Sequence, residues 1–199
     1  MKNLVLLLLC VVTMATPAFA QTSANNKATL SFSVFNENFG LSPLPQGNPL
    51  HLGGAIAIAF TKKQNGIYRK VNNIELGFFK HETIFQAAYL AWKPQYEWQF
   101  NNGFQLHGLT GLGYLHALPT QTTFVQNDGI YEATTNLGKP GGVASLGLGL
   151  GYQFGKNNST SVTLFARQEL LLIAPFGINE SFPLGVNSLL KLGVAIQLF

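Results

Sequence analysis

The sequence predicts an all-β protein: an eight-stranded antiparallel up-and-down transmembrane β-barrel. Of its 199 residues, 47% are hydrophobic and only 10% are charged, whereas about a quarter of the residues of a soluble domain are charged. The 16 Phe exclude intrinsic disorder. After residue 20 no apolar run approaches the ~20 residues that a membrane-spanning helix needs. A chain that places apolar surface in lipid without such runs is expected to close into a barrel.

Residues 1–20 have the features of a secretory signal peptide. Lys2 supplies the positive charge, a short apolar stretch follows, and Ala18-Phe19-Ala20 forms a small-residue cleavage site. We therefore expect the barrel domain to occupy residues 21–199. The only cysteine, Cys10, lies in the signal, so the predicted domain can form neither a disulfide nor a thiolate metal site.

Apolar and polar residues alternate in eight segments, which is the pattern of a strand with one apolar face. The segments are 29–34, 52–60, 73–78, 84–100, 104–114, 143–154, 161–172 and 190–198. In the first three, apolar residues such as Phe32 and Ile58 alternate with Ser, Ala, Asn or Gly. In the fourth, Trp92 and Trp98 oppose Lys93. These four segments predict strands with their apolar side chains on the outer face.

The four later segments repeat the pattern. Residues 104–114 place Leu106 opposite His107, and residues 143–154 alternate large apolar side chains with Gly, Ser and Gln. In residues 161–172, apolar positions oppose Arg167, and in residues 190–198 they oppose Lys191, Gly, Ala and Gln. The count of strands is therefore eight.

The turn Asn101-Asn102-Gly103 fixes a register. A three-residue hairpin loop with Gly last, in the left-handed conformation, pairs Phe100 with Phe104. The same register pairs Glu97 with His107 on the polar face, and we expect these two side chains to be bonded.

The other connections vary in length. Residues 40–49, 118–140 and 174–186 form long connections, and 101–103 and 155–159 form short ones. In barrels of this kind the short turns face the periplasm and the long loops face outward. Residues 62–70 are predicted to be a long, basic inner connection. Pro94 is predicted to mark a bulge or a bend, because proline has no N–H for the strand ladder.

Together, the cleavable signal, the eight amphipathic strands and the terminal Phe199 resemble the small eight-stranded outer-membrane barrels of Gram-negative bacteria, the OmpA/OmpX-like superfamily. Aromatic residues near the predicted strand ends, among them Trp98, Phe100 and Tyr152, fit an interfacial girdle. The resemblance implies a multi-pass outer-membrane protein that contacts the assembly machinery, outer-membrane lipids and lipopolysaccharide. Phe199 departs from the family pattern, because the apolar positions of the last strand are in phase with Leu198 instead.

Charged residues on the polar face are predicted to meet inside the barrel, since an Arg or Lys facing lipid at mid-membrane costs about 2–4 kcal/mol. Arg167 is expected near the centre of a salt-bridge network that plugs the lumen, because its five donors can serve two carboxylates. The predicted lumen network comprises Glu75, Lys93, Glu97, His107, Arg167, Glu169 and Lys191.

The favoured function is a non-enzymatic structural or interaction role in the cell envelope, with loop 118–140 as the contact surface for an envelope or surface protein. A lipid hydrolase is one alternative, because Ser33, Glu37 and His51 share an inward face near one loop. The resembling barrel deacylases carry a late His-x-Ser-Asn stretch, whereas the last histidine here is His116.

A soluble lipocalin-like carrier is the second alternative, although the Gly-x-Trp opening typical of that family is missing near Phe35. We expect no cofactor and no metal site. Nucleic acid is not an expected partner, because 12 basic residues against 8 acidic ones leave only a small, dispersed surplus.

Overall fold

The computed structural model describes residues 28–40, 50–80, 85–120, 123–127, 130–134, 137–155, 161–174 and 184–198. It shows a closed β-barrel with an additional two-stranded hairpin. The strands are β1 Ala28–Phe39, β2 His51–Asn65, β3 Tyr68–Lys80, β4 Phe85–Gln99, β5 Phe104–Pro119, β6 Thr123–Asn127, β7 Ile130–Thr134, β8 Lys139–Phe154, β9 Val162–Ala174 and β10 Gly185–Gln197. The predicted signal peptide and Phe199 lie outside the described residues.

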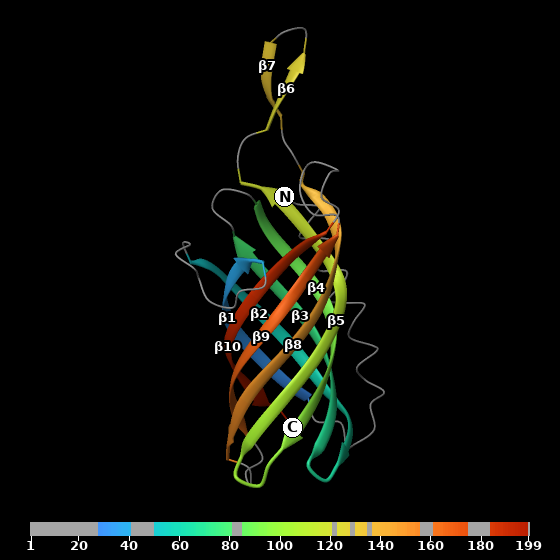
Figure 1. The fold of residues 1–199 in the computed structure, drawn as a ribbon, viewed down its shortest axis with the longest axis vertical. Helices are drawn as coiled ribbons and strands as arrows, with labels where there is room; N and C mark the ends of the chain where they lie inside the picture. Colours follow the sequence, from blue (N-terminus) through green and yellow to red (C-terminus); the bar gives the residue numbers. More distant parts are fainter. Residues whose placement is uncertain are drawn as a thin grey trace.

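Eight of these strands close the barrel in the order β1-β10-β9-β8-β5-β4-β3-β2, with β6 and β7 paired separately. All the ladders are antiparallel. The strands are tilted, and the β6–β7 hairpin stands beyond one end of the barrel (Figure 1). We call this the hairpin end, and the opposite end, which carries the turn at Asn101–Gly103, the tight-turn end. The predicted fold class is confirmed.

The predicted hairpin register is also confirmed. The backbone N–H of Phe100 donates to the carbonyl of Phe104 over 2.9 Å, and the Gly103 N–H donates to the Phe100 carbonyl over 3.1 Å. Gly103 has a φ of 89°, the left-handed conformation that this loop requires. Glu97 and His107 face each other across the β4–β5 ladder.

The prediction of a long inner connection at residues 62–70 is wrong. β2 and β3 continue through most of this segment, and the ladder extends to the pair Asn65 and Tyr68. A shift of register between Thr61 and Lys63 marks a β-bulge. The two residues left for the turn begin with Gly66, whose φ of 57° is readily adopted by glycine. The sequence pattern did not predict these strand ends for two reasons. The segment contains several basic residues, and the alternation of apolar and polar residues breaks where a bulge inserts one residue.

Pro94 interrupts one ladder without a bulge, so of the two predicted outcomes the bulge is wrong and the bend stays a prediction. Between β4 and β5 the pairing passes from Trp92–Leu112 to Gln95–Leu109, so two rungs are missing while the register is unchanged. On its other side Pro94 pairs with Asn72 in an unbroken ladder. Because proline has no N–H, the hydrogen bonding between β4 and β5 is weakened at this point, but the register of the two strands does not change.

The outer surface of the barrel is apolar. Outward side chains such as Val34, Leu112 and Leu148 are 64–71% exposed. The expected aromatic girdle is present toward the tight-turn end, where Trp98 and Tyr152 face outward. Such a surface is suited to lipid and not to water. A soluble lipocalin-like carrier would need these residues inside. Within the described residues no helix is long and apolar enough to cross a membrane.

The interior has an apolar layer that the sequence analysis did not predict. It lies toward the hairpin end and is built from inward side chains of most of the strands. Its largest members are Phe35, Phe79, Tyr89, Leu115, Leu171, Ile173 and Leu189. Inward glycines make room for the rings, since a Cβ at Gly77 would lie 2.3 Å from Tyr89 Cζ. The hairpin-end half of the lumen is thus packed like a soluble core.

Candidate functional site

Four charged side chains meet at mid-barrel in a compact group, which we call the charged box: Glu75, Lys93, Glu169 and Lys191. Lys93 Nζ lies 2.7 Å from Glu75 Oε1 and 2.6 Å from Glu169 Oε2. Lys191 Nζ lies 2.6 Å from the same Glu75 oxygen and 3.1 Å from the same Glu169 oxygen. Each lysine therefore bridges both carboxylates.

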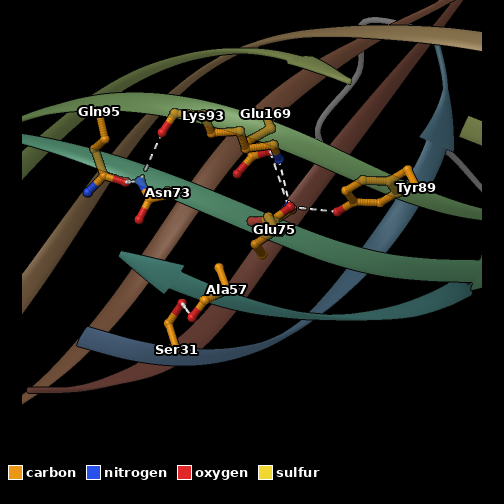
Figure 2. Close-up of polar contacts among 9 residues, drawn as sticks. Ser31, Ala57, Asn73, Glu75, Tyr89, Lys93, Gln95 and Glu169 are labelled. Carbon is orange, nitrogen blue, oxygen red and sulfur yellow. Dashed lines mark hydrogen bonds and ion pairs between the residues drawn. The ribbon is translucent and has the colours of Figure 1, made fainter. Parts of the chain in front are cut away.

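The charged box ties opposite walls of the barrel together. Glu75 and Lys93 come from the neighbouring strands β3 and β4, and Glu169 and Lys191 come from β9 and β10 on the far side of the ring. Figure 2 shows Glu75, Lys93 and Glu169 pointing toward one another, with Tyr89 beside them. All four charged residues are at most 4% exposed. Two positive and two negative groups balance, as burial of charge requires.

Tyr89 joins this box to the apolar layer. Its hydroxyl donates to Glu75 Oε1 over 2.7 Å and accepts a hydrogen bond from Lys191 Nζ over 3.1 Å. Lys191 Nζ also lies 5.2 Å from the centre of the Phe35 ring, within cation–π range. The Tyr89 and Phe35 rings of the apolar layer thus contact Lys191 on its hairpin-end side.

A second polar group lies toward the tight-turn end. Glu97 accepts hydrogen bonds from the guanidinium of Arg69 and, over 2.5 Å, from Gln95 Nε2. The Asn73 amide donates to Gln95 Oε1 over 3.0 Å and to the Lys93 carbonyl over 3.1 Å (Figure 2). Sequence reasoning missed Arg69, because it placed residue 69 in a loop and not on the inward face of β3.

Two of the predicted network residues are placed differently from expectation. Arg167 is not at the centre of the network: it forms no ion pair with a described carboxylate, and its guanidinium lies 4.3 Å from the Phe165 ring centre. Lys93 and Lys191 reach the mid-barrel carboxylates instead. His107 bonds through Nε2 to Gln105 Oε1, 3.1 Å away, and not to Glu97, because Arg69 and Gln95 already occupy that carboxylate.

The hydrolase arrangement is only partly assembled. Glu37 and His51 pair across β1 and β2, with His51 Nδ1 3.5 Å from Glu37 Oε2. Ser33 lies four residues farther along β1, a distance of about 13 Å at the rise of a strand, and the buried Phe35 side chain comes between. The three residues therefore do not form a nucleophile–base–acid relay. Among the described residues no group of three His, Cys, Asp or Glu could hold a metal ion.

Comparison with known proteins found no matching family model and no matching curated protein. Among solved structures, the chain is similar to Neisserial surface protein A at 10% identity, covering 89% of this chain and 99% of that one, with a TM-score of 0.49. It is also similar to the outer membrane enzyme PagL at 12% identity, covering 84% of this chain and 97% of that one, with a TM-score of 0.45. A third similar structure is the N-terminal β-barrel domain of Pseudomonas aeruginosa OprF, at 11% identity, covering 87% of this chain and 99% of that one, with a TM-score of 0.44. The chain's own closed eight-stranded topology is the architecture that the OmpA/OmpX-like resemblance implied.

Proposed function

We propose that this chain is a non-enzymatic outer-membrane protein of a Gram-negative bacterium, with a structural or interaction role in the cell envelope. The observation that carries the proposal is the filled lumen. The apolar layer and the charged box occupy successive levels inside the barrel, and their side chains are almost fully buried. Eight strands leave an interior that side chains can fill, and a lumen filled in this way favours a rigid scaffold over an open channel.

The β6–β7 hairpin is the proposed contact element for an envelope or surface protein. It pairs from Thr123–Thr134 to Asn127–Ile130 and stands clear of the barrel (Figure 1). Its sequence holds Phe124, Val125 and Tyr131 among polar residues. Apolar residues in the sequence of a hairpin that extends beyond the barrel are suited to a protein contact. The apolar outer wall would contact outer-membrane lipids and lipopolysaccharide.

Replacing residues 123–134 by a short Gly-Ser linker should abolish crosslinking of the protein to its partner in intact outer membranes. The barrel ladders do not include this hairpin, so the variant should still migrate as the folded form in unboiled gels. Lys70→Gln, a change near the tight-turn end, is the matched control and should leave the crosslinks unchanged. Crosslinks that persist in the linker variant would show that the hairpin is not the contact element.

Deletion of the gene should leave lipid A acylation unchanged, because the described residues do not bring Ser33 to the Glu37–His51 pair. Mass spectrometry of lipid A from the deletion strain and its parent is the measurement. The hydrolase alternative would instead be supported by an acylation change that is reversed by the wild-type gene and not by His51→Ala.

A further inference from the structure

A small polar cavity lies between the charged box and the tight-turn end. Its volume is about 40 Å³, which is room for about three water molecules. Its wall combines hydroxyls, amides and the side chains of Arg69, Glu97, His107 and Arg167. The neighbouring charged box contributes no net charge, because its two lysines and two glutamates pair with one another.

The charges that line this cavity do not balance. Arg69 is paired with Glu97. Arg167 is left as a second cation with no described carboxylate opposite it, and its Nε is buried without a hydrogen-bond partner. The adjacent residue across the β9–β10 ladder is Lys191, another cation. Arg167 is half-buried, and a cation that lies beside other cations without a carboxylate partner favours a bound anion.

His107 stands beside Arg167 on the same wall. Gly149 pairs with His107 on one side and with Arg167 on the other. A Cβ at Gly149 would lie 2.5 Å from Arg167 Cγ, and a Cβ at Gly151 would lie 3.0 Å from His107 Cε1, so these two glycines leave space for the two side chains. The Arg167 side chain therefore lies over Gly149 and the imidazole over Gly151, two residues apart on the same face of β8.

A chain of glutamine amides sets the hydrogen-bonding role of the His107 ring. Gln99 Nε2 and Gln105 Nε2 both donate to Gln153 Oε1, over 2.8 and 3.2 Å. Gln105 therefore turns its oxygen toward His107 Nε2, 3.1 Å away, and an amide oxygen can only accept. The uncharged ring then carries its proton on Nε2 and presents an unshared electron pair at Nδ1, which is buried without a partner.

We propose that this cavity binds a small protonated oxoanion, hydrogen phosphate, with Arg167 as its anchor. The planar guanidinium donates to two oxygens of a tetrahedral anion, a geometry that arginine matches well. The phosphate hydroxyl donates to His107 Nδ1. Sulfate has no proton to donate at neutral pH, so it would leave Nδ1 unpaired and bind more weakly.

The test is calorimetric titration of the purified, folded barrel in detergent with sodium phosphate and, separately, with sodium sulfate at matched ionic strength. Wild type should bind one phosphate saturably in the millimolar range or tighter, and sulfate about tenfold more weakly, which corresponds to about 1.4 kcal/mol. Phosphate should also raise the temperature at which the folded gel band is lost, because a ligand that binds only the folded state stabilises it.

Variants at both anchoring positions complete the test. Arg167→Met should lower phosphate affinity at least about tenfold, and in phosphate-free buffer it should be as stable as wild type, because an unpaired charge is removed. If that variant does not fold, Arg167→Lys, which keeps the charge and loses the two-pronged donor, should also bind phosphate more weakly. His107→Leu should abolish the preference for phosphate over sulfate, and Lys80→Met, on the exposed end of β3, should change nothing. The proposal is overturned if wild type shows no saturable binding, or if the folded Arg167 variant binds phosphate with unchanged affinity.

Discussion

Replacing Lys191 by methionine is expected to lower the free energy of unfolding by about 3–5 kcal/mol, the cost of leaving a buried charge without its partner. Lys191 Nζ bonds to Glu75 Oε1, Glu169 Oε2 and the Tyr89 hydroxyl. Without it, one lysine remains to compensate two buried carboxylates. Urea titration of the detergent-folded protein, followed by the loss of the folded gel band, measures the change.

A second substitution separates charge imbalance from lost packing. Glu169→Gln on the Lys191→Met background leaves one lysine and one glutamate and keeps an oxygen that accepts from Lys93. The double variant should recover part of the lost stability, the signature of coupled charges in a double-mutant cycle. Lys80→Met, on an exposed residue, is the control and should change stability by less than about 0.5 kcal/mol. Unchanged stability in Lys191→Met would contradict this account, because the buried box would then not need Lys191 for charge balance.

The alternation of the sequence was sufficient to predict which side chains share the lumen, because a strand has a strict period of two. Glu75, Lys93, Glu169 and Lys191 were placed on the inward face for that reason, and the structure brings them together. Alternation does not say which inward residues lie within reach across the barrel. That depends on strand tilt and on ladder register, which is why Arg167 was wrongly placed at the centre.

The apolar layer was missed for a related reason. Where both faces of a strand are apolar, period-2 alternation disappears, as in the run Leu170-Leu171-Leu172-Ile173 of β9. Leu171 and Ile173 point inward and are at most 2% exposed, whereas Leu172 is 40% exposed on the outer face. A continuous apolar run in a barrel strand is therefore itself a signal of an apolar lumen at that height. Leu189-Leu190 on β10 carries the same signal.

Two glycine-to-alanine variants on β5 test how tightly the barrel is packed. The first, Gly113→Ala, is expected to lower the free energy of unfolding by about 1–3 kcal/mol, the usual cost of overpacking. A Cβ at Gly113 would lie 2.3 Å from the Leu90 carbonyl oxygen and 2.6 Å from Ala91 Cα. Both are backbone atoms of the neighbouring strand β4, so no side-chain rotation can relieve the clash. The ladder itself would have to move, and unfolding by urea should begin at a lower concentration.

Gly108→Ala on the same strand is the matched control with the opposite expected sign. Its Cβ would face outward, and the nearest atom, Trp98 Cζ3, would be 3.7 Å away, an ordinary van der Waals contact. Alanine lowers the conformational entropy of the unfolded chain relative to glycine, which is worth about 0.4–1 kcal/mol where the native backbone accepts it. The control should therefore match or exceed wild type in the same urea titration. Equal urea midpoints for the two alanine variants would contradict this account. Inward and outward glycines would then be interchangeable, and the close approach of β4 and β5 at Gly113 would not require a glycine there.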